Sequence, residues 1–195
     1  MSRQATSFIL GYHGCDFWIA EKAVNQGADI LMSDRDYDWL GSGAYFWESD
    51  QVRALEWAEW KVSQDHYRKA AVVGAVIELR NCLDLSNRED IPLIRGGYDS
   101  FVESQTKTGK EVPINRSVKG DSNADRVLRF LDCAVINHLH NAIAADPDVP
   151  DFDTVRGVFT EGGDVYPGCG FKEKTHVQIA VRNKACIRGI FFPRA

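Results

Sequence analysis

Three short segments of the sequence carry side chains that could bind and orient a small ligand. They are His13-Gly14, the run Gly-Ser-Gly-Ala-Tyr-Phe-Trp at residues 41–47, and Gln178 within the stretch 176–181. An imidazole can donate or accept a proton, an aromatic ring can stack on a flat ligand, and an amide can hydrogen-bond a hydroxyl group. Taken singly, each segment has an ordinary interpretation: a loop histidine, core aromatics and a solvent-facing amide.

Motifs of several common enzyme classes are missing. Gly41-Ser42-Gly43 is too short for a P-loop, and the chain contains neither Gly-x-Ser-x-Gly nor His-Glu-x-x-His. The five cysteines are scattered and form no Cys-x-x-Cys pair. His138 and His140 are two residues apart and so do not share a helix face. We therefore expect no metal site and no disulfide framework, and a reducing cytoplasm as the location.

Charge and length narrow the class of protein further. With 23 basic and 28 acidic residues the 195-residue chain has a net charge of −5, which argues against a basic nucleic-acid scaffold. A local basic strip built from Arg156, Arg182 and Lys184 is compatible with that balance. The apolar runs are too short to span a membrane, and residues 1–10 lack the zones of a signal peptide. We expect one domain covering residues 1–195.

The elements that must position the three segments follow from apolar patterning. Strands are expected at residues 7–13, 44–47, 70–79, 155–159, 176–181 and 187–192. Asp16 and Asp50 should cap two helices, Gly27 should end the first, and Ser122 with Asp125 should open a third. The first strand should end in a tight loop at His13-Gly14. This order of elements favours the α+β class over a doubly wound sheet.

Residues 87–120 have weak periodicity, with two adjacent glycines and two prolines. We expect a long surface excursion there, at most partly helical. This excursion is part of a longer helical and loop insertion that we expect at about residues 87–153. The motif segments named above lie outside it.

Order and spacing make the three segments resemble the ADP-ribosyltransferase superfamily, in the branch marked by His, Tyr and an acidic or amide residue. That branch includes poly-ADP-ribose polymerases and diphtheria toxin, and small bacterial members are more similar still. The matching residues are His13-Gly14, then Gly41, Gly43, Tyr45 and Phe46, and then Gln178. The resemblance implies a split β-sandwich of two small antiparallel sheets with flanking helices.

The resemblance also implies NAD as co-substrate, with no metal. The NAD-binding residues would be His13, Gly14, Gly43, Tyr45 and Trp57. His13 would hydrogen-bond the adenosine-side ribose, and the Gly14 backbone would hold the carboxamide. Tyr45 would stack on the nicotinamide, with Trp57 or Trp47 on the second face. Cleaving the nicotinamide–ribose bond builds an oxocarbenium-like centre, which needs orientation and electrostatic support rather than a strong nucleophile.

Gln178 departs from the glutamate that is commoner at the third position. An amide can bond a ribose hydroxyl but cannot accept a proton or carry negative charge. Glu161, in the glycine-rich loop before Gln178, is a candidate general base toward the acceptor, and an exposed turn carboxylate is its alternative interpretation. The missing glutamate favours transfer of a single ADP-ribose unit.

The expected function is therefore mono-ADP-ribosyl transfer from NAD to a protein or nucleic acid, by a bacterial toxin or phage-defence effector. The catalytic residues would be His13, Tyr45, Gln178 and Glu161. An antitoxin would be an expected partner, and a membrane would not. Two alternatives stay open: an NAD glycohydrolase on the same scaffold, and a catalytically inactive module that binds NAD.

Overall fold

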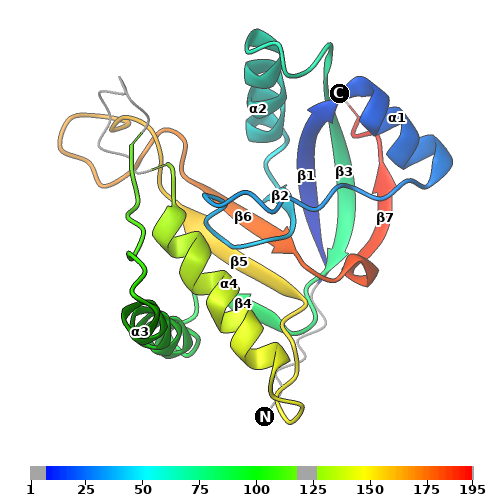
Figure 1. Ribbon diagram of the computed structural model, residues 1–195. Coiled ribbons are helices and arrows are strands. Elements are labelled where there is room, and N and C mark those ends of the chain that lie inside the picture. Colours follow the sequence, from blue (N-terminus) through cyan, green and yellow to red (C-terminus); the bar gives the residue numbers. More distant parts are fainter. Residues whose placement is uncertain (1–7, 118–126, 195) are drawn as a thin grey trace.

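The computed structural model describes residues 8–117 and 127–194, which form an α+β fold (Figure 1). The strands are β1 (Phe8–Asp16), β2 (Ala44–Glu48), β3 (Ala70–Glu78), β4 (Cys82–Asp84), β5 (Thr154–Phe159), β6 (His176–Val181) and β7 (Ile187–Phe191). The helices are α1 (Phe17–Gln26), α2 (Gln51–Ser63), α3 (Ile91–Thr108), α4 (Phe130–Ala144) and the short 3₁₀ helix η1 (Lys184–Cys186).

All seven strands belong to one hydrogen-bonded sheet with the order β4-β5-β6-β2-β1-β3-β7. Neighbouring strands are antiparallel except β4 and β5, which are parallel. Two separate small sheets, as expected from the resemblance, are thus not confirmed. The join between β1 and β2 is narrow, because it consists of the residue pairs Gly11–Glu48 and Tyr12–Trp47, whereas β1 and β3 pair over nine residues. On either side of this join the strands run in different directions (Figure 1).

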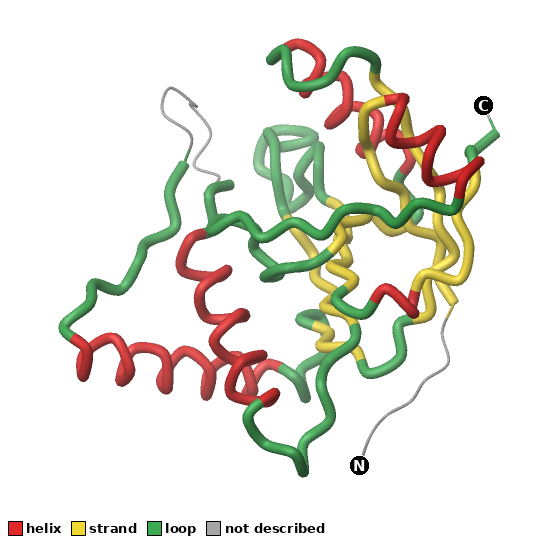
Figure 2. The backbone as a smooth tube through the Cα atoms, turned by 45° about the vertical axis from the view of Figure 1, so that its right-hand side comes forward, coloured by secondary structure: helices red, strands yellow, loops and turns green. Residues whose placement is uncertain are grey.

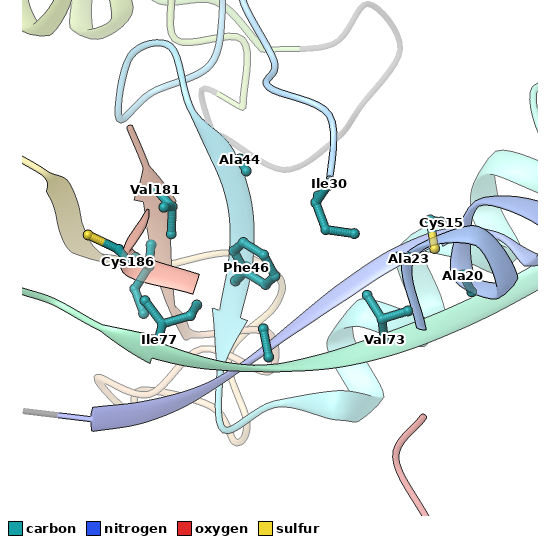
Figure 3. Close-up of a cluster of buried hydrophobic side chains, with 12 residues drawn as sticks. Cys15, Ala20, Ala23, Ile30, Ala44, Phe46, Val73, Ile77, Val181 and Cys186 are labelled. Atoms are coloured by element: carbon teal, nitrogen blue, oxygen red, sulfur yellow. The ribbon is translucent and has the colours of Figure 1, made fainter. Parts of the chain in front are cut away.

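Helices cover both faces of the sheet. Side chains alternate along β2, so Phe46 faces one side and Tyr45 and Trp47 face the other. The Phe46 face is buried with Ala20 and Ala23 of α1 (Figure 3). On the opposite face α2 packs against β1 and β3, and α4 covers the part of the sheet built from β5 and β6.

Several local predictions are confirmed. Asp16 Oδ1 accepts a hydrogen bond from the Trp18 N–H at the start of α1, and Gly27 ends this helix with a positive φ of 68°. Asp50 Oδ1 accepts from the Arg53 N–H at the start of α2. The prediction that the first strand ends at His13-Gly14 is wrong. β1 continues to Asp16 because β3 pairs with it along its whole length.

The prediction of a largely irregular segment at 87–120 is also wrong, since α3 is an 18-residue helix within it. Only Gly97 and Phe101 of this helix are buried. Gly97 lies where α3 crosses α4, and a Cβ there would come 3.2 Å from the Leu139 Cβ. Two adjacent glycines are a loop signal in a sequence, but here one of them lets two helices approach closely. Figure 2 shows α3 and α4 as two crossing helices beside the sheet. The predicted capping box at Ser122 and Asp125 lies outside the described residues.

Candidate functional site

The three motif segments lie on three consecutive strands, β1, β2 and β6. His13 Nδ1 is 2.8 Å from the Tyr45 carbonyl oxygen, which links β1 to β2 where the two strands separate. On the other side of β2, Trp47 is directly opposite Gln178 of β6. Segments that are far apart in the sequence are therefore neighbours across the sheet.

His13 lies on the Phe46 face of the sheet, and its ring centroid is 5.7 Å from that of Phe46. Tyr12 pairs with Trp47, so alternation places His13 on the face opposite Tyr45 and Gln178. Burial lowers the pKa of His13 and keeps the imidazole neutral. Since a carbonyl only accepts, Nδ1 carries the proton, and Nε2 is left as a hydrogen-bond acceptor.

Gly14 is required by the packing of α2 on β1. A Cβ at this position would lie 2.1 Å from the Ala54 carbonyl oxygen and 3.3 Å from the Ala58 Cβ. The resemblance assigns this glycine to close approach of a ligand. The structure adds a second reason, which is close approach of a helix backbone.

The backbone polar groups of Gly14 point away from β3. Backbone direction alternates along a strand, and the Phe17 N–H is bonded on the β3 side while the Leu10 carbonyl is bonded on the β2 side. Gly14 is an even number of residues from Leu10, so its backbone N–H and C=O also point to the β2 side. Because the pairing with β2 ends at Tyr12, the N–H and C=O of Gly14 are directed beyond the end of that pairing.

Tyr45 is tied to the glycine turn that precedes it. Its hydroxyl accepts from the Leu40 N–H at 3.0 Å and donates to the Gly41 carbonyl at 2.8 Å. Burial raises the pKa of this phenol well above its ordinary value, so it stays protonated. The Tyr45 ring packs against the cluster that contains Leu40 and Ala180. This arrangement fixes the turn in which Gly41 has a φ of +75°.

Gly43 holds the turn against the end of the sheet. It exchanges both backbone hydrogen bonds with Ser33, at 2.8 and 2.9 Å. A Cβ on Gly43 would come 3.0 Å from the Ala180 Cβ of β6. Gly43 therefore positions β2 beside β6.

Side chains from α2, the neighbouring strands and the loop after β5 form what we call the Trp47 cluster, made of Trp47, Arg53, Trp57, Phe159, Glu161 and His176. The Trp47 ring centroid is 6.1 Å from that of Trp57 and 6.2 Å from that of His176. His176 stacks on Phe159 at 5.5 Å. The Arg53 Cζ is 5.8 Å from the Trp47 ring centre, and its Nη2 pairs with Glu161 Oε2 at 2.8 Å.

Three buried nitrogens of this cluster have no hydrogen-bond partner among the described residues: Trp47 Nε1, Arg53 Nε and His176 Nε2. The His176 Nδ1–H donates to the Lys174 carbonyl at 2.6 Å, and burial lowers the pKa of this histidine, so Nε2 is an unprotonated acceptor. The tryptophan and arginine nitrogens are donors. Buried polar atoms are nearly always paired, so three unpartnered nitrogens in one cluster are unusual.

Gln178 and Glu161 are both engaged by other side chains. The Trp39 Nε1–H donates to Gln178 Oε1 at 2.6 Å, and Glu161 is the partner of Arg53. The Trp57 ring lies beside those of Trp47 and Trp60, with ring centroids 6.1 and 5.0 Å apart, whereas Tyr45 packs against the cluster that contains Leu40. The nicotinamide sandwich between Tyr45 and Trp57 or Trp47 stays a prediction.

Sequence reasoning missed Trp39, Arg53 and His176. Arg53 and Trp57 are four residues apart on a helix, and His176 is two residues before Gln178 on a strand, so both belong to faces that carried predicted residues. Trp39 had no such signal, because its bond to Gln178 spans 139 residues. The three basic residues considered for a phosphate strip are also engaged: Arg156 binds two carboxylates, Arg182 donates to a backbone carbonyl, and Lys184 pairs with an aspartate.

Within residues 8–117 and 127–194, no three His, Cys, Asp or Glu side chains are grouped so that they could hold a metal ion. No helix in these two ranges has both the length and the apolar character needed to cross a membrane.

No family model and no solved structure matches the chain. It is similar to the uncharacterized protein MJ0359 of Methanocaldococcus jannaschii. The two are 26% identical over 195 residues, an alignment that covers 91% of this chain and 83% of that protein.

Proposed function

We propose that the protein is an NAD-dependent mono-ADP-ribosyltransferase that transfers ADP-ribose to a protein or nucleic acid. The proposal rests on the motif residues lying on adjacent strands and on the chemistry of the Trp47 cluster beside them. It includes the finer fold, in which the two halves of the sheet on either side of the narrow β1–β2 join correspond to the two layers of a split sandwich. It also includes action in the cytoplasm as a toxin or phage-defence effector with a neutralising protein partner.

The unpartnered nitrogens of Trp47, Arg53 and His176 carry the proposal. Two donors and one acceptor complement a primary carboxamide, whose oxygen accepts two hydrogen bonds while its NH₂ group donates one. The aromatic rings of the same cluster suit a flat pyridinium. NAD carries both features on its nicotinamide. The outward-directed backbone of Gly14 is close by, because Arg53 precedes Ala54, the residue that packs on Gly14.

In the proposed reaction the bond between ribose C1′ and the pyridinium nitrogen breaks, and its electron pair stays on the departing neutral nicotinamide. An acceptor oxygen or nitrogen forms the new bond to C1′, and its proton passes to a base such as Glu161. Gln178, held by Trp39, would bond a ribose hydroxyl. His13 lies on the opposite face of the sheet from Gln178, so its role would be to hold β1 against β2 through its hydrogen bond to the Tyr45 carbonyl.

A second candidate function is NAD binding without turnover. Gln178 brings no negative charge, and the Glu161 carboxylate is already paired with Arg53. Both observations reduce the electrostatic support for a developing cation.

The proposal is tested by incubating the protein with NAD labelled on the adenylate and a cell lysate, then measuring free nicotinamide and labelled macromolecules. We expect both, and we expect Arg53→Met to lower both at least tenfold. The matched control is Arg188→Met, which removes an exposed ion pair with Glu78 at the far edge of the sheet. Nicotinamide without labelled macromolecule selects a glycohydrolase. Calorimetric NAD binding with no products selects the binding module, and no binding at all overturns the proposal.

A further inference from the structure

A second site lies between α3, α4 and the loop before β2, apart from the Trp47 cluster. It is an apolar cavity of about 470 Å³. This is about three times the roughly 150 Å³ that accommodates benzene in an engineered protein cavity. Its volume is therefore sufficient for a molecule of two or three rings, within the range of ordinary ligand sites.

Aromatic and branched aliphatic side chains form most of the wall. Trp39 closes one side, Ile94 and Tyr98 come from α3, and Leu131 and Val135 come from α4. Both helices contribute to the wall, and Gly97 lets α4 approach α3 where the two cross (Figure 2). Two aromatic residues in the wall favour a flat ring system as occupant.

The charged residues of the wall are Arg95, Arg129 and Asp132, and the rest of the lining is mostly apolar. Arg129 pairs with Asp132 at 3.0 Å, and Arg95 pairs with the exposed Asp99 at 3.0 Å. A charged ligand would lose its hydration against a mostly apolar wall, so an uncharged ligand is favoured. The Arg129 side chain is 27% exposed, which leaves its guanidinium within reach of a ligand.

We propose that this cavity binds an uncharged aromatic molecule of two or three rings that carries a carbonyl acceptor for Arg129. The ring system fills the apolar space against Trp39 and Tyr98, and the carbonyl oxygen accepts from the guanidinium. Neutrality of the ligand follows from the mostly apolar wall, against which a charge would be poorly solvated.

The position of Trp39 couples this site to the sheet. Its indole lines the cavity, and its ring centroid is 5.1 Å from that of Phe159. The indole Nε1–H donates to Gln178 Oε1 at 2.6 Å. A ligand in the cavity therefore touches the side chain that orients Gln178.

The test uses the neutral fluorophore 6-propionyl-2-dimethylaminonaphthalene, which has two fused rings and one ketone, and needs no NAD. We expect saturable binding to the full chain with a blue-shifted emission. Ile94→Trp fills the cavity and should weaken binding at least tenfold. Leu93→Trp is the matched control, because Leu93 is the adjacent α3 residue, is 44% exposed and does not line the cavity. Arg129→Met should weaken binding about fivefold if one charge-assisted hydrogen bond is lost.

Circular dichroism establishes that each variant is folded, so that a loss of binding reports on the cavity. Water-like emission with the wild-type protein overturns the proposal, as does equal binding by Ile94→Trp and Leu93→Trp. The anion 1-anilinonaphthalene-8-sulfonate should bind at least tenfold more weakly than the neutral ketone. If it binds equally or better, the ligand class is wrong.

Discussion

Replacing Gly14 by alanine is the sharpest test of how α2 sits on the sheet. The new Cβ would lie 2.1 Å from the Ala54 carbonyl oxygen, which belongs to the helix backbone and cannot rotate away. Either α2 or β1 has to move. Overpacking of this kind typically costs about 1–3 kcal/mol, and a clash with backbone should lie in the upper half, at about 2–3 kcal/mol.

The size of the effect can be converted into a melting temperature. For a domain of this length each kcal/mol shifts Tm by about 2–4 °C, so Gly14→Ala should melt about 4–12 °C below the wild type. The assay is thermal unfolding followed by circular dichroism at pH 7.5. Stability is the quantity measured, so the result is independent of any ligand.

Gly96→Ala is the matched control for this substitution. Gly96 lies in α3, and a Cβ there would meet nothing within 4 Å. Alanine is favoured over glycine in a helix by about 0.5–1 kcal/mol, so this variant should melt at or slightly above the wild-type temperature. If Gly14→Ala melts together with the wild type, α2 does not pack against Gly14 as described, and the account of the Trp47 cluster loses its support.

Two further predictions concern the histidine buried in α4 and the residue at the third motif position. Burial lowers the pKa of His140 from 6.5 to about 3, so the unfolded chain binds a proton that the folded chain does not, and stability falls as the pH drops below 6.5. Between pH 7.5 and 5.5 this linkage removes about 1.4 kcal/mol. Urea titrations at the two pH values give the loss in the free energy of unfolding. This loss should be smaller by that amount in His140→Leu than in the exposed control His66→Leu, and equal losses would contradict the burial of His140. Gln178→Glu should raise NAD turnover at least tenfold, because the Trp39 Nε1–H can donate equally well to a carboxylate; an unchanged rate would mean that charge at position 178 does not limit the reaction.

Local signals allowed much of the fold to be predicted. The β-branched run of β3 and the capping side chains of Asp16 and Asp50 act within a few residues, and each element formed where it was expected. α3 was missed because Pro92 and the adjacent glycines 96–97 are loop signals, whereas here the proline lies in the first turn of the helix and Gly97 is a packing position. Long strands are easier to recognise than helices that bury so little.

The candidate site was harder to predict than the fold, because it depends on strand register. The sequence places His13 and Tyr45 in neighbouring motifs, but the pairing of Tyr12 with Trp47 puts their side chains on opposite faces. The bond between Trp39 and Gln178 likewise results from the pairing of distant segments. The residue types of such a site can be inferred locally, whereas the faces they occupy follow from long-range pairing.

The two-pair join between β1 and β2 has a mechanical consequence. A slight pivot at Tyr12 and Trp47 would turn one half of the sheet against the other while every other ladder stayed intact. Trp47 lies at that pivot and at the centre of its cluster. A rotation of a few degrees would change the distance between the Gly14 backbone and the rings beside it, and the core shared by Phe46, Ile77 and Ile179 would oppose that rotation.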